Sequence, residues 1–99
     1  MAITAEIVFA AMKDFRSKFP EDAQRLRGDQ EEFTDEQLTT RSEVIAKAFN
    51  GDEEALNLVK EYSAKHGSKH TEGDIANIAS CFPENVRDEV KEKLSKFHA

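Results

Sequence analysis

Apolar residues recur every three or four positions along most of this chain, and no stretch alternates strictly between apolar and polar residues. Spacing of three to four is the period of an amphipathic helix, whereas strict alternation is the period of a half-buried strand. The pattern therefore predicts an all-α protein, a compact six-helix domain built from three short helical hairpins. The predicted helices cover residues 4–19, 20–27, 34–49, 52–66, 71–82 and 83–97.

The third helix has the clearest boundaries. Thr34 is suited to accept a hydrogen bond from the backbone N–H of Gln37, whose side chain can reach back to Thr34, and Phe33 and Leu38 are spaced as a hydrophobic staple. Asn50-Gly51 suits a left-handed helix end. Because the next helix starts directly afterwards, helices three and four are expected to form a hairpin.

Two prolines and three threonines mark the other boundaries. Pro20 and Pro83 cannot continue a helix but suit the first position of a new one. Thr4, Thr34 and Thr71 are predicted N-caps, and each begins a helix that ends in phenylalanine before a tight break. This weak repeat indicates three hairpins, and it leaves open whether they stack as a solenoid or close into a bundle.

The core is expected from the inward stripe of each long helix. Arg41 falls within the stripe of the third helix and is expected to lie at its edge, with the charged end in solvent. His66 continues the stripe of the fourth helix. The residues expected to point inward are Ile7, Val8, Ala11, Met12, Phe15, Phe19, Leu38, Val44, Ile45, Ala48, Phe49, Ala55, Leu58, Val59, Tyr62, Ile75, Ile78, Ala79, Phe82, Val86, Val90, Leu94 and Phe97.

Length and charge restrict the classes of function. The 99 residues are expected to form a single helical domain, residues 1–99, as a monomer or homodimer. A net charge of −6 argues against nucleic acid and anionic membranes as partners. The single cysteine, Cys81, excludes an internal disulfide, and the apolar run Ile7–Met12 is too short for a membrane span. We therefore expect a cytoplasmic protein.

An acidic stretch is the first candidate site. It consists of Asp29, Glu31, Glu32, Asp35 and Glu36, with no basic residue among them. The spacing is not that of an EF-hand loop, and no nucleophile–base pair or glycine-rich phosphate loop accompanies it. The favoured interpretation is a small acidic protein–protein interaction module, an adaptor, inhibitor or regulatory subunit without catalytic activity or cofactor. The acidic stretch would then steer a partner protein with a basic surface.

The second candidate site is a pair of histidines, His66 and His70. On a continuous helix they would share a face and could hold zinc, but Gly67 is expected to end the helix between them, and no CxxC or HExxH motif is present. No metal site is therefore predicted.

The segment Leu58–His70 resembles the end of the F helix of globins, and Phe19-Pro20-Glu21 resembles the join between the globin B and C helices. This resemblance implies an alternative function, a globin-like haem-binding domain with His66 as the proximal ligand of haem iron. Gln37, twenty-nine residues earlier, would be the distal residue. The chain departs from the globin pattern at Leu26, where globins place a phenylalanine that stacks on haem.

Overall fold

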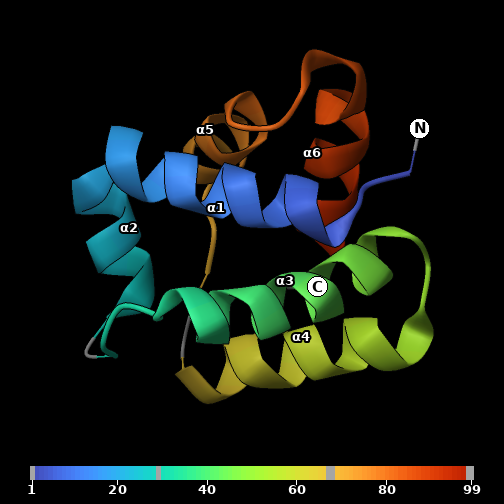
Figure 1. Ribbon diagram of the computed structural model, residues 1–99, viewed down its shortest axis with the longest axis horizontal. Helices are drawn as coiled ribbons and strands as arrows, with labels where there is room; N and C mark the ends of the chain where they lie inside the picture. The colour runs from blue at the N-terminus through green and yellow to red at the C-terminus, as the bar shows by residue number, and fades with distance from the viewer. Residues whose placement is uncertain (1, 29, 67–68, 98–99) are drawn as a thin grey trace.

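The computed structural model describes residues 2–28, 30–66 and 69–97, without the side chain of His66, and these residues contain six α-helices, one 3-10 turn and no strand. The predicted all-α class and the six helices are confirmed. The elements, drawn in Figure 1, are α1 (Ala5–Lys18), α2 (Pro20–Arg27), α3 (Asp35–Phe49), α4 (Glu53–His66), α5 (Glu72–Ser80), η1 (Glu84–Val86) and α6 (Arg87–Lys96).

The predicted caps account for where the helices begin. At the start of α3, Gln37 N–H donates to Thr34 Oγ1 (3.2 Å) and Thr34 N–H donates to Gln37 Oε1 (3.0 Å). Thr71 and Asp74 form the same reciprocal pair at the start of α5, with distances of 3.1 and 3.0 Å. Each pair satisfies two backbone N–H donors that the helix itself leaves unpaired, so local sequence defines both helix starts.

The break between α3 and α4 also follows the prediction. Gly51 adopts a φ of 94°, a conformation that side-chain-bearing residues rarely adopt, and Asp52 accepts a hydrogen bond from Ala55 N–H (2.9 Å). Pro20 is the first residue of α2, as expected.

The prediction for Pro83 was wrong in detail. Pro83 has an extended ψ of 143° and precedes the 3-10 turn, so the last α-helix starts at Arg87 rather than at the proline. The Arg87 side chain donates from Nε to Phe82 O (2.9 Å) across this turn. The turn also buries Val86, which is 1% exposed, and this tertiary packing is not visible in a helix-start pattern.

The helices close around a common core. In Figure 1, α1 lies along α3, and α3 lies along α4. α5 packs against both α6 and α1, which joins the last part of the chain to the first. Because repeats in a solenoid contact only their sequence neighbours, this contact identifies a closed arrangement.

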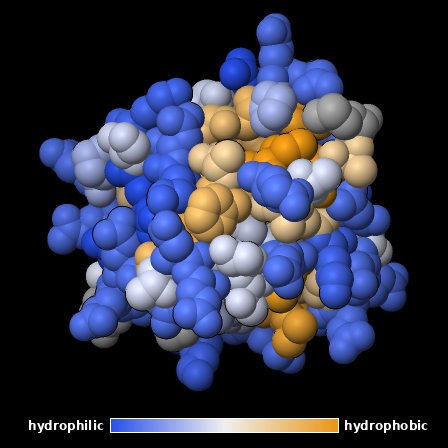
Figure 2. Space-filling model, viewed as in Figure 1, coloured by the Kyte–Doolittle hydropathy of each residue, from blue (hydrophilic) through white to orange (hydrophobic). Residues whose placement is uncertain are grey.

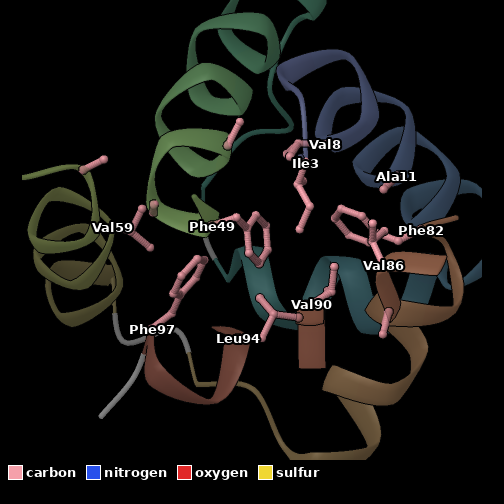
Figure 3. Packing of buried hydrophobic residues seen from close by; sticks show 14 residues of the cluster. Ile3, Val8, Ala11, Phe49, Val59, Phe82, Val86, Val90, Leu94 and Phe97 are labelled. Carbon is pink, nitrogen blue, oxygen red and sulfur yellow. The ribbon is translucent and has the colours of Figure 1, made fainter. Parts of the chain in front are cut away.

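Three phenylalanines from distant segments meet at the centre of the core. The ring of Phe49 lies 5.8 Å from that of Phe82 and 5.1 Å from that of Phe97, centroid to centroid (Figure 3). Val59 and Leu94 are buried in the same core. The end of α3, the turn after α5 and the residue after α6 are therefore held together by one aromatic cluster.

The inward stripes were mostly as predicted, with two corrections. Leu58 was expected to point inward but is 49% exposed, because α4 buries the narrower row Ala55, Val59 and Ser63 against its neighbours. Ile3, which precedes the first helix and has no periodic signal, is fully buried. The row Ala55, Val59 and Ser63 has a strict spacing of four, which places Leu58 on the flank of the helix.

Candidate functional site: an apolar cavity beside α3 and α4

A partly open cavity with a volume of about 240 Å³ lies between the helices of the described residues. All six α-helices contribute side chains to its wall, and most of these side chains are apolar. Examples are Phe15 from α1, Ile45 from α3 and Ile78 from α5. Ligand sites in proteins are typically concave, mostly apolar and furnished with few polar groups, so this cavity is the candidate site.

Much of the polar part of the wall is built by α3, α4 and the segment before α3. The guanidinium carbon of Arg41 lies 3.9 Å from the centroid of the Tyr62 ring, a cation–π stack between α3 and α4. The Tyr62 hydroxyl donates to Gln30 Oε1 (2.6 Å), and the Phe33 ring lies 6.5 Å from the Tyr62 ring. His70, which is half-buried, lines the same cavity. Tyr62 thus connects the polar groups to the apolar wall.

Arg41 is half-buried, and no carboxylate of the described residues forms an ion pair with it. No hydrogen bond or ion pair joins it to another described residue; its interaction is with the face of Tyr62. Burial lowers the pKa of the Arg41 guanidinium below its ordinary value, and the charge interaction with Tyr62 acts in the opposite direction. The arginine stays protonated at neutral pH, because its ordinary pKa is far above 7. A positive charge therefore lies at the edge of an apolar cavity.

The acidic stretch forms part of the rim of this cavity, and α1 holds it in place. Arg16 Nε lies 3.2 Å from Glu32 Oε1, and Lys13 Nζ lies 3.1 Å from Asp35 Oδ1. Arg16 also donates from Nη1 to the backbone oxygen of Phe33 (3.1 Å). Two carboxylates that have no basic neighbour in the sequence are thus paired with bases from α1.

The other acidic residues are placed differently. Glu31 lines the cavity and is exposed, while Glu36 is exposed on the first turn of α3. Asp29 lies outside the described residues. The structure consequently brings Glu31 and Glu32 to the cavity and leaves Asp35 and Glu36 on the outer surface.

Of the two residues of the globin-like hypothesis, only the Gln37 side chain lies in the described part of the structure. The Gln37 side chain is exposed and bonded to the Thr34 N–H, and it is not part of the cavity wall. His66 ends α4, about one helical turn beyond the cavity-lining Ser63, and its side chain lies outside the described residues. His70 is the histidine that the structure places at the cavity.

Metal and thiol chemistry have little support in the described residues. No group of three or more His, Cys, Asp or Glu residues among them is arranged to hold a metal ion. Cys81 is half-buried, and burial raises the pKa of its thiol, which keeps it protonated at neutral pH. Cys81 is therefore a packing residue near the core.

The sequence pattern placed Arg41 at the edge of the apolar stripe of α3 and Tyr62 on the apolar stripe of α4, but it did not predict that the two side chains are in contact. The predicted hairpin of these two helices was the signal that could have indicated this contact, because the apolar stripes of two paired helices face each other. Nothing in the sequence indicated that Gln30, in a loop, would bond to Tyr62.

No model of a known protein family, no curated protein sequence and no solved structure matches this chain. Among the helices of the described residues, none combines the length and the apolar character that are needed to cross a bilayer. Figure 2 shows mostly hydrophilic residues on the face that it draws, with hydrophobic residues gathered from the centre to the upper part of the view and a smaller group near its lower edge.

Proposed function

We propose that this protein binds a small, largely apolar molecule in the cavity between its helices. The observation that carries the proposal is the cavity itself: about 240 Å³ of partly open space, lined mostly by apolar side chains and with contributions from all six α-helices. Well-packed interiors contain few voids larger than a water molecule, and a void in the core costs stability. A protein of this size that keeps such a cavity gains that stability back when a ligand fills it.

The volume limits the size of the ligand. An engineered apolar cavity of about 150 Å³ in another protein takes up benzene, so the present cavity is suited to a body of benzene's size with a short extension. A ligand of about ten non-hydrogen atoms is of this order. This range covers short alkyl chains and single-ring compounds.

The test is a calorimetric titration with 1-octanol, a neutral probe of this size. We expect saturable binding by the wild-type protein and a higher midpoint of thermal unfolding at saturation. The variant Ala23→Leu, which adds bulk to the cavity wall, should weaken binding. Ala10→Leu is the matched control, because Ala10 is exposed on α1 and does not line the cavity.

Two results would count against the proposal. One is the absence of saturable binding to a wild-type protein that circular dichroism shows to be folded. The other is equal weakening by Ala23→Leu and Ala10→Leu, which would place the probe outside the cavity. Ser63→Leu, a second cavity-wall variant on α4, covers the case in which Ala23→Leu disturbs the fold.

Haem binding is the second candidate. The observation that favours it is the course of the cavity along α4 as far as Ser63, close to His66, together with His70 in the wall. Haem is considerably larger than the cavity, so α3 and α4 would have to separate and the Arg41–Tyr62 stack would have to open. Native mass spectrometry and a haem titration followed by absorbance would test this. A Soret band that persists in His66→Ala would remove His66 as the ligand.

Recognition of a basic partner protein by the acidic stretch stays a prediction. Glu32 and Asp35 are already neutralised by Arg16 and Lys13, which weakens the negative field of this surface. Glu31 and Glu36 are therefore the residues on which charge reversal tests partner association without breaking these ion pairs.

A further inference from the structure

We infer that the ligand of this cavity is an amphipathic anion, a short alkyl or aryl carboxylate, whose carboxylate binds Arg41 while its apolar part fills the cavity. This inference rests on the proposed function and adds the chemical class of the ligand. Three observations support it: the half-burial of the Arg41 charge, the balance of charge along the cavity wall, and the geometry of the stack of Arg41 on Tyr62.

Arg41 is a half-buried cation with no anionic partner in the part of the chain that the structure describes. Moving a charged group out of water costs free energy unless an opposite charge or hydrogen-bond acceptors replace the water. Among the described residues, Arg41 has neither, whereas five other cations, Lys13, Arg16, Lys18, Arg25 and Lys96, form ion pairs with carboxylates. A carboxylate brought by the ligand supplies the missing acceptor.

The charge of the cavity wall is opposite to the charge of the molecule. The chain has a net charge of −6, yet three arginines (Arg16, Arg27 and Arg41) and two glutamates (Glu31 and Glu32) line the cavity. Arg16 is paired with Glu32. On the described part of the wall, Arg27 and Arg41 then face Glu31 alone, so these side chains give the wall a net positive charge. Positively charged walls of low dielectric favour the entry of an anion.

The stack with Tyr62 prepares Arg41 for a carboxylate. With its guanidinium carbon 3.9 Å from the ring centroid, the flat group rests on the ring face and its N–H edge stays available. Tyr62 is itself held by the hydrogen bond to Gln30 (2.6 Å). A guanidinium oriented in advance binds the two carboxylate oxygens with less loss of side-chain entropy than a freely moving one.

The test compares octanoate with 1-octanol, two probes of nearly equal size that differ in charge at pH 7. Isothermal titration calorimetry should show wild-type protein binding octanoate more tightly than octanol. Arg41→Gln should weaken octanoate binding about tenfold or more, because a hydrogen bond to a charged group contributes that much to affinity. The same variant should change octanol binding less than about twofold. Lys47→Gln, which removes one charge from an exposed site on α3 away from the cavity, should change neither.

The outcomes separate the two proposals. If octanol binds but octanoate binds no better, or if Arg41→Gln leaves octanoate binding unchanged, the anion inference fails and the apolar binding function stands. If neither probe binds to folded wild-type protein, the proposed function itself fails. Should Arg41→Gln unfold, Arg41→Lys replaces it: this variant keeps the charge but loses the planar fork, and octanoate affinity equal to wild type would overturn the two-oxygen contact.

Discussion

At the scale of single residues, Phe49 is the side chain whose removal we expect to disturb the packing of the core most. It is 1% exposed and ends α3 at the point where that helix meets the two other phenylalanines of the core, Phe82 and Phe97. Aromatic side chains bury more apolar area than any other type, and these tilted and edge-on ring contacts add to that burial. Loss of this ring leaves a void that three separate segments would have to fill.

Phe49→Ala should lower the free energy of unfolding by about 3–5 kcal/mol, measured by urea denaturation. Leu58→Ala is the matched control on the neighbouring helix, because Leu58 is 49% exposed, and it should cost less than about 1 kcal/mol. Equal losses in the two variants would mean that the assignment of buried and exposed apolar residues on α3 and α4 is wrong.

At the scale of single helices, the start of α3 is determined locally. The reciprocal bonds of Thr34 and Gln37 use only residues within one turn, and they are exposed to solvent. The stability that these two hydrogen bonds give to the helix start therefore depends little on the rest of the fold. The same holds for the start of α5, except that Asp74 of its capping box is buried.

Thr34→Ala should destabilise the protein by about 0.5–2 kcal/mol through loss of the cap. Thr40→Ala is the same substitution on the exposed face of α3, where alanine favours the helix, so its stability should equal or slightly exceed that of the wild type. Thermal unfolding of the two variants side by side checks this. A Thr34→Ala variant as stable as Thr40→Ala would show that the cap contributes nothing.

At the scale of the whole molecule, a buried carboxylate joins two helices that are distant in sequence. Arg25 of α2 donates to Asp74 of α5 (2.5 Å), and Asp74 is 4% exposed. Burial raises the pKa of the Asp74 carboxyl, but hydrogen bonds from the Thr71 backbone N–H and from Arg25 outweigh it, and the net pKa is lowered. The ionised form of Asp74 therefore stabilises the folded state.

The pKa of Asp74 is lower in the folded state than in the unfolded state. The contribution of its ionised carboxylate to the free energy of unfolding is therefore complete above the ordinary carboxyl pKa of about 4, and it is lost as the pH falls through the pKa of the folded state. The difference in unfolding free energy between wild type and Asp74→Asn should be largest near pH 6–7 and shrink below about pH 4. Urea denaturation across this range measures it.

Asp22→Asn is the control for this experiment, because Asp22 shares Arg25 (3.4 Å) but is partly exposed and caps no helix. Its profile should stay close to that of the wild type. A difference between wild type and Asp74→Asn that does not change with pH would contradict the assigned role of the ionised carboxylate.

The sequence by itself determined the all-α class, the six helices and most of their ends. These features depend on interactions within one or two helical turns: the cap at Thr34, the restricted backbone of Pro20, the left-handed break at Gly51. The acidic stretch was equally visible, but its pairing with Lys13 and Arg16 was not, because those bases lie on another helix.

Only the tertiary structure decided the burial of Ile3, the exposure of Leu58, the 3-10 turn after Pro83 and the cavity with Arg41 and Tyr62 in its wall. Each of these depends on which helices become neighbours and at what angle, and helical periodicity defines a face without naming what covers it. The contact of α5 with α1 closes the fold, and the packing of all six helices forms the cavity on which the proposed function rests and the charged wall on which the anion inference rests.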